Sequence, residues 1–177
     1  GSMRVQVQKL AQKDVWQTNL FDGATVTKDS KINMGNLTIN GTSIDTTNKS
    51  YSDLVTEINK ISGVQASLIE SSDGKFRLAI KSTETGTANK INFNTKDISG
   101  NDLGVSSGAA KLFGDGSALS DSLNVLKAQN MQLKADGVDY SSSSNTVTID
   151  GLKITATKKS GDSTINIEND TTTLSAQ

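Results

Sequence analysis

Carboxylates are the side chains best able to do chemistry in this sequence, because it contains neither histidine nor cysteine. A glycosidase needs two carboxyl groups about 5–10 Å apart across a cleft. The surrounding patterns place Glu57, Glu70 and Glu84 on a helix, at a strand end and in a loop. Nothing in this spacing brings two of them together. We interpret them as solvated surface groups and predict no catalytic residue.

Two segments rich in glycine and aspartate raise the question of calcium binding: DISGND at 97–102 and GDGSALSD at 114–121. An EF-hand loop needs oxygen ligands at positions 1, 3, 5 and 12 and glycine at position 6. Counting from Asp97 leaves no glycine at position 6, and counting from Asp115 puts Leu119 at position 5. We therefore expect turns in both segments and predict no metal or cofactor site.

The serine run at 141–144 could hold a nucleophile only as part of a Ser-x-x-Lys pair, because histidine is absent. None of the four serines has lysine three residues later, so a flexible connection between strands is the expected role. Without cysteine the chain can form no disulfide and no thiolate metal site. Trp16, the single tryptophan, is expected in a core or between domains rather than as a ligand platform.

The composition favours thin, sheet-rich units. Apolar residues make up 33% of the chain, whereas globular domains average about 45–50% on a count that includes glycine. Such a chain builds two-layer units rather than one thick core. The net charge is −1 and aromatic residues are 4%, which argues against nucleic acid as a partner. No apolar run approaches the roughly 18 residues of a membrane span, so no membrane partner is predicted either.

One helix has a clear sequence signature, near residues 51–62. Ser50 and Asp53 have the spacing of a capping box. Leu54, Ile58 and Ile61 follow at i, i+4 and i+7, which gives one apolar face. Gly63 stands where a C-cap glycine is common. These signals predict a helix of about three turns.

Alternating apolar residues and turn dipeptides predict strands along most of the remaining chain. Asn40-Gly41 is typical of a two-residue hairpin turn. The predicted strands are Val5–Leu10, 31–39 and 42–46, a hairpin of 64–68 with 76–80, and a second β unit over 127–170 with turns at Asp136-Gly137 and Asp150-Gly151. Residues 94–120, with scattered apolar residues such as Ile98 and Leu103, are predicted to form loops and short strands. Leu119, Leu123 and Leu126 suggest a brief helix.

Three stretches together resemble the flagellar filament-capping family, hook-associated protein 2 (FliD). VQVQKLAQ at 5–12 resembles the opening strand of the family's head, and residues 50–91 resemble the "flagellin hook IN" motif. Residues 128–167 are similar to the start of the family's C-terminal half. The matching residues are Ile58-Asn59, Gly63-Val64-Gln65-Ala66, Arg77-Leu78 and Thr85-Gly86, then Asp136-Gly137-Val138, Ser144-Asn145-Thr146-Val147 and Gly151-Leu152-Lys153-Ile154. The resemblance covers roughly half of the chain, and residues 94–126 carry none of it.

The resemblance implies a nested head that is mainly β with minor α. It consists of two small antiparallel-sheet domains, one inserted into the other. The first head domain is then expected at 4–24 plus 122–174, and the inserted domain at 25–121. Val5–Leu10 should pair with strands within 131–167. Gly1-Ser2-Met3 resembles a cloning remnant and is left out of the fold prediction, with a fragment of a longer chain expected from Arg4 onward.

The resemblance also implies a function without catalysis. The family forms a homo-oligomeric cap outside the cell, at the distal tip of the flagellum, and guides flagellin into the filament. Its members are exported without a cleaved signal peptide. Two alternatives stay open: a variable outer domain of a flagellin or hook–filament junction protein, and a surface adhesin module that binds mucin or host glycan. An enzyme is disfavoured, and the residues of an oligomer interface are not predicted.

Overall fold

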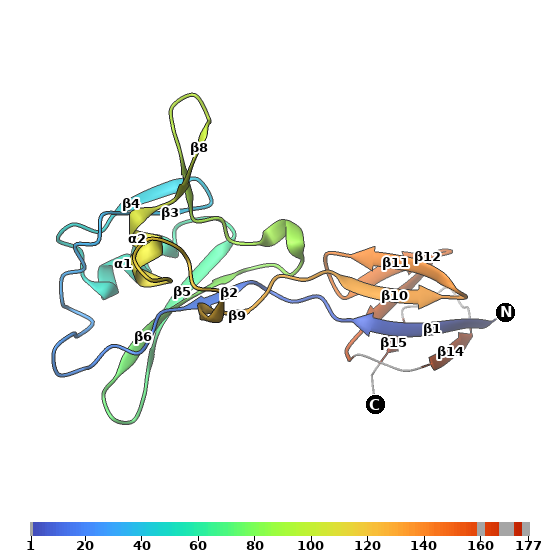
Figure 1. The fold of residues 1–177 in the computed structure, drawn as a ribbon. Helices are drawn as coiled ribbons and strands as arrows, with labels where there is room; N and C mark the ends of the chain where they lie inside the picture. The colour runs from blue at the N-terminus through green and yellow to red at the C-terminus, as the bar shows by residue number, and fades with distance from the viewer. Residues whose placement is uncertain (1, 159–161, 167–171, 175–177) are drawn as a thin grey trace. The chain divides into compact units, whose positions relative to one another are not determined.

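The chain forms two compact units. This computed structural model describes residues 2–158 in full and the backbone of residues 162–166 and 172–174. The first unit comprises Gly1–Asp14, Glu84–Lys90 and Lys127–Gln177, and the second comprises Val15–Thr83 and Ile91–Leu126. Strands dominate both units and helices are few and short, so the predicted fold class, mainly β with minor α, is confirmed. Figure 1 shows the fold as a ribbon, coloured along the chain by residue number.

The first unit is built from two small sheets that share one core. Its strands are β1 (Ser2–Lys9), β10 (Met131–Ala135), β11 (Val138–Ser142), β12 (Thr146–Ile149), β13 (Leu152–Ala156), β14 (Asp162–Asn166) and β15 (Thr172–Leu174). One sheet has the order β11-β10-β1-β14 and the other β12-β13-β15. All described pairings in this unit are antiparallel except β13 with β15, which is parallel. Alternate residues of the strands supply the core, for example Val5, Leu133 and Ile154.

Strand β1 joins the two ends of the sequence in one sheet. It lies between β10 and β14, with Val5 opposite both Ala135 and Ser163. The predicted pairing of this strand with the 131–167 region is therefore confirmed. The strand predicted at Val5–Leu10 begins earlier than expected, because β1 includes Ser2 and Met3, and Met3 is only 2% exposed.

The second unit packs two helices and two hairpins with one antiparallel sheet of order β5-β6-β2-β9. The elements are β2 (Val15–Gln17), β3 (Asn36–Ile39), β4 (Thr42–Asp45), α1 (Tyr51–Ile58), β5 (Val64–Glu70), β6 (Phe76–Ser82), β7 (Asn94–Lys96), β8 (Asp102–Val105), α2 (Ser107–Leu112) and β9 (Asn124–Leu126). Trp16 is buried in the core of this unit, as the sequence predicts. Among the described residues, no helix has the length and apolar character that crossing a membrane requires.

Three hairpins turn on the dipeptides that the sequence singles out. Asn40, Asp136 and Asp150 have φ angles of 49°, 49° and 50°. The glycine after each also has a positive φ, 86°, 79° and 77° in the same order. Two consecutive residues with positive φ match the tight turn whose twist fits the flanking strands. Local turn chemistry thus sets the register of β3–β4, β10–β11 and β12–β13.

Helix α1 begins as predicted but ends earlier. The capping box is complete, since the Ser50 hydroxyl accepts from the Asp53 N–H and the Asp53 carboxylate accepts from the Ser50 N–H. The helix stops at Ile58 rather than near residue 62, so it has about two turns, not three. Asn59 ends it because its side chain bonds to the main chain of Ala66 in the next strand.

Three other predictions are corrected by the structure. The strand expected at 31–39 is confined to β3, because Asn33 and Gly35 have positive φ angles of 47° and 75° that break an extended chain. The helix suggested at 119–126 is a single 3-10 turn, Asp121–Leu123, followed by strand β9 on β2. Helix α2 lies where loops and short strands were expected, since a six-residue helix is too short to show an apolar period.

Three segments belong to a different compact unit than the predicted domain boundaries assign them to. Residues 15–24 and 122–126 join the second unit, because β2 and β9 complete its sheet. Segment 84–90 joins the first unit instead. There the Gly86 N–H donates to the Gln12 carbonyl at 3.0 Å, and the Thr87 N–H donates to Asn130 Oδ1 at 3.0 Å. That the chain consists of two head domains, one inserted into the other, stays a prediction.

Candidate interaction surfaces

The carboxylates considered for catalysis lie on three separate elements. Glu57 is on α1, Glu70 ends β5, and Glu84 belongs to the segment that joins the first unit. Glu57 forms an ion pair with Lys49 at 3.1 Å. Within the described ranges, no group of three histidine, cysteine, aspartate or glutamate side chains is arranged to hold a metal ion. Glu70 and Glu84 are exposed, as expected. Glu57 is not the solvated surface group that was expected, because it is half-buried and its Oε2 is buried without a hydrogen-bond partner.

The two segments tested as calcium loops form turns. Asp97 Oδ1 accepts from the N–H groups of Ser99 and Asn101, at 2.9 and 2.8 Å. Asp115 Oδ1 likewise accepts from the N–H groups of Ser117 and Ala118, each at 2.8 Å. Each carboxylate thus braces its own backbone.

The serine run is more ordered than the flexible connection expected for it. Ser141 and Ser142 belong to β11, and the Ser142 hydroxyl donates to the Thr146 carbonyl at 2.9 Å. The Ser143 carbonyl accepts from the Thr85 hydroxyl at 2.6 Å. These side chains and carbonyls fasten segment 84–90 and the β11–β12 turn, which is a structural role.

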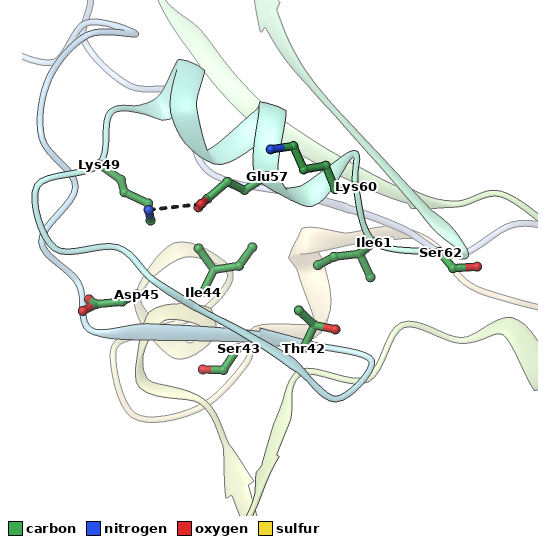
Figure 2. A pocket seen from close by; sticks show the side chains of 9 residues that line it. All are labelled: Thr42, Ser43, Ile44, Asp45, Lys49, Glu57, Lys60, Ile61 and Ser62. Carbon is green, nitrogen blue, oxygen red and sulfur yellow. Dashed lines mark hydrogen bonds and ion pairs between the residues drawn. The ribbon is translucent and has the colours of Figure 1, made fainter.

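A hollow of about 450 Å³ lies between helix α1 and strand β4. Figure 2 shows the side chains that line it. Ile44 and Ile61 project into the space between helix and strand, and the Lys49–Glu57 ion pair lies at one side. The lining consists of Thr42, Ser43, Ile44, Asp45, Lys49, Glu57, Lys60, Ile61 and Ser62. Two lysines and two carboxylates balance in charge, and no nucleophile with a neighbouring base is present in this lining. The hollow can hold an apolar side chain, but it has no arrangement for catalysis.

The first unit has a hollow of its own, of about 440 Å³, beside β10 and β11. It is lined by Gln8, Gln132, Lys134, Asp139, Tyr140 and Ser141. Lys134 and Asp139 face each other across the strand pair at 3.9 Å. Surface pairs of this kind contribute little to stability and do not form a reactive site.

The outer face of the sheet in the second unit is open. Residues of β5, β6 and β2 alternate, with Val64, Ile80 and Trp16 turned to the core. The opposite face carries a hollow of about 650 Å³, which we call the sheet-face hollow. It is lined by Val15, Gln17, Asn59, Gln65, Ala66, Ser67, Ile69, Ala79 and Lys81. Its centre is made of small side chains, because Ser67 lies opposite Ala79.

The free edge of that sheet is partly closed by the asparagine of the IN motif. Asn59 Nδ2 donates to the Ala66 carbonyl at 3.1 Å, and Asn59 Oδ1 accepts from the Ala66 N–H at 2.7 Å. β5 is an edge strand, so these main-chain groups would otherwise be available to a strand of another chain. The motif thus joins a buried isoleucine, Ile58, to an asparagine that protects the edge.

Replacing Asn59 with alanine should lower the free energy of unfolding of the second unit by about 1 kcal/mol, because two hydrogen bonds to the main chain are lost at a solvent-exposed site. Urea unfolding followed by the fluorescence of Trp16 measures this change. Lys60→Ala, at the next exposed position, is the matched control and should stay within about 0.5 kcal/mol of the parent chain. Equal losses in the two variants would contradict the role of Asn59.

The β7–β8 hairpin projects from the second unit (Figure 1). Ile98, at its tip, is 106% exposed, and Leu103 is 63% exposed.

Main-chain and side-chain hydrogen bonds from Asn101 hold the pKa of Asp97 below its ordinary value. The Gly104 N–H and the Asn94 side chain do the same for the pKa of Asp102. Both carboxylates are therefore ionised at neutral pH, and their stabilising bonds are lost only as pH falls through the lowered pKa values.

The sequence did not predict this hairpin as a surface feature. Ile98 and Leu103 are predicted only as scattered apolar residues among loops and short strands. One signal of exposure was present in the sequence. Ile98 is a large apolar residue within a turn that runs from Asp97 to Asn101, and its side chain reaches no core. Only the exposed fractions show that these side chains face solvent.

Comparisons with known proteins agree on one family. Flagellar hook-associated protein 2 of Campylobacter jejuni is 32% identical over 203 aligned residues, which cover 96% of this chain and 31% of the relative. The protein of the same name from Escherichia coli K12 is 32% identical over 160 residues, covering 83% of this chain and 32% of the relative. The chain thus spans about a third of the length of the curated relatives it matches. No protein-family model matches the chain.

Solved structures give the same result. The D2-D3 domains of the flagellar cap protein FliD from Escherichia coli align with a TM-score of 0.62 and 26% identity, over 84% of this chain and 76% of that one. The D2-D3 domains of FliD from Serratia marcescens share the fold, with a TM-score of 0.63 and 24% identity over 95% of this chain and 93% of that one.

The split, sheet-rich units and the match to solved D2-D3 domains define the class of this protein as a flagellar cap head region. The chain belongs to the flagellar hook-associated protein 2 (FliD) family, and the resemblance drawn from its motifs is confirmed. This is a family of structural flagellar cap proteins, not a family of enzymes.

Proposed function

We propose that this chain is the head region of a flagellar cap protein. In the whole protein it sits outside the cell at the distal tip of the filament and guides flagellin into place. The cap consists of several copies of the protein and catalyses no covalent reaction. The observation that carries the proposal is the 32% identity along 96% of the chain to a protein named flagellar hook-associated protein 2.

The surfaces of the two units fit a role in assembly. The described hollows are lined by mixed polar and apolar side chains, without a nucleophile beside a base. Sheet-rich units whose hollows have such mixed linings can take part in protein contacts, which join polar and apolar groups. Nothing among the described residues favours mucin or host glycan as a partner, so we do not propose an adhesive role.

Deletion of the full-length gene in its source organism tests the proposal. We expect cells with bare hooks and flagellin monomer in the medium, since export continues while polymerisation at the tip fails. Purified full-length protein should restore filaments. Filaments of normal length and stability in the deletion strain would contradict the cap role.

A second strain tests the head region itself. It carries the full-length gene with only the segment that matches this chain removed. Shortened or absent filaments would support a role of the head in assembly. Filaments equal to wild type would assign the cap function to other parts of the protein.

Sequencing the secreted full-length protein from its N-terminus tests the mode of export. An intact N-terminus would support export without a cleaved signal peptide.

A further inference from the structure

Ile98 is presented to solvent on a hydrogen-bonded turn. Single exposed apolar residues are common on protein surfaces and carry no meaning alone. Here, however, the side chain sits in a turn that is fixed on both sides by Asp97, through bonds to Ser99 and Asn101. A braced turn loses little conformational entropy when it binds, which favours recognition. The hairpin therefore offers an ordered apolar knob.

The sheet-face hollow of the same unit has the opposite shape. Ala79 forms its floor, and although this residue is on the open face of the sheet it is only 8% exposed. Val15 and Ile69 add apolar surface to the lining. The volume, about 650 Å³, leaves ample room for a branched aliphatic side chain. A small floor with two larger apolar side chains beside it, within a lining that is otherwise mostly polar, can receive an isoleucine knob.

The charges beside the two features are also complementary. Asp97 and Asp102 outnumber Lys96 in the hairpin. Lys81 is the charged residue in the described lining of the hollow, and Arg77 lies on the same face, where it donates to Gln17 at 3.1 Å. Opposite charges around an apolar contact select orientation and raise the rate of encounter.

We propose that Ile98 of one copy of this chain docks into the sheet-face hollow of a second copy, with Asp97 and Asp102 beside Lys81 and Arg77. This inference rests on the proposed function, because it names the contact by which cap copies meet. Knob and hollow are different surfaces of one unit, so the contact is heterologous. Repetition of such a contact produces a ring when the rotation closes, as a cap of identical copies requires.

Disulfide trapping between two single-cysteine variants tests the contact, and the absence of natural cysteine makes the result unambiguous. Ser99→Cys places a thiol next to the knob, and Ser67→Cys places one opposite Ala79 in the hollow. A docked pair raises the effective concentration of the two thiols. We expect the mixed dimer to form at least about tenfold faster than the mixed dimer of Ser99→Cys with Ser141→Cys, whose serine lines the hollow of the first unit.

Two further substitutions assign the effect to the knob. Ile98→Asp in the Ser99→Cys chain should reduce the rate of mixed-dimer formation to that of the control pair. Val138→Asp changes a side chain that is 54% exposed on a different hairpin, and it should leave the rate unchanged. Raising the salt concentration should slow trapping, because it screens the paired charges. Circular dichroism verifies that each variant is folded.

The outcomes separate this inference from the proposed function. Equal trapping rates for the Ser67→Cys and Ser141→Cys partners, or no effect of Ile98→Asp, would overturn the docking contact. Either result would leave the cap role to be judged by the gene deletion. Normal filaments after gene deletion would remove the cap role, while fast, Ile98-dependent trapping would still establish the contact between copies.

Discussion

Replacing Phe113 with alanine should lower the free energy of unfolding of the second unit by about 3–5 kcal/mol. Phe113 is fully buried, and its ring stacks on Phe93 with centroids 5.2 Å apart and planes inclined by 23°. Trp16 meets both rings edge-on, at 6.2 Å from Phe113 and 5.5 Å from Phe93. The substitution leaves a cavity among three aromatic rings, and packed surroundings collapse only partly into such a space.

Urea unfolding followed by Trp16 fluorescence measures this effect in the unit that contains it. The sequence has a single tryptophan, and Trp16 belongs to the second unit, so the signal does not report on the first. Leu103→Ala is the control for loss of an apolar side chain at an exposed site and should stay within about 0.5 kcal/mol. A loss below about 1 kcal/mol for Phe113→Ala would show that the aromatic cluster is not the centre of this core.

Deleting residues 2–9 should unfold the first unit and leave the second folded. Strand β1 lies between β10 and β14, so its loss divides the sheet. It also removes three buried side chains, those of Met3, Val5 and Val7. At about 1.5–3 kcal/mol each, these contribute roughly 4.5–9 kcal/mol. That is comparable with the total stability of a typical domain, about 5–15 kcal/mol.

Amide hydrogen exchange with mass spectrometry distinguishes the two units in this experiment. Peptides within residues 131–156 should lose protection in the shortened chain, whereas peptides within 51–82 should keep it. Gln8→Ala, which changes only an exposed side chain of β1, is the control and should retain both patterns. Unchanged protection at 131–156 after the deletion would show that β1 is dispensable. Loss of protection in both ranges would contradict the prediction that the units fold independently.

The local elements of this fold follow from short stretches of sequence. The positive φ angles of Asn40, Asp136 and Asp150 occur in the Asn-Gly and Asp-Gly pairs that predict hairpin turns. The capping box of Ser50 and Asp53 fixes the start of α1. Each signal involves residues at most a few positions apart, and its energy does not depend on the rest of the chain. The family resemblance could be recognised from the sequence for the same reason, because its motifs are short runs of neighbouring residues.

The end of α1 shows where local reading fails. Gly63 and the apolar Ile61 both favour a longer helix, yet the helix ends at Ile58. The competing interaction is the pair of bonds between Asn59 and Ala66. No helix-propensity rule contains such bonds, because they require β5 to be already in place. Helix α2 was missed because six residues are too few to show an apolar period, and its buried residues pack into a core that other segments supply.

The sequence by itself determined that the protein is mainly β, where its hairpins turn, where its main helix starts, and that imidazole and thiolate chemistry are absent. Only the tertiary structure decided the register in which β1 pairs with strands more than a hundred positions away. It also decided that segment 84–90 belongs to the first unit and that Ile98 faces solvent while Ala79 floors a hollow. The physical reason is that local preferences act over neighbouring residues, whereas pairing and burial depend on which distant segments meet.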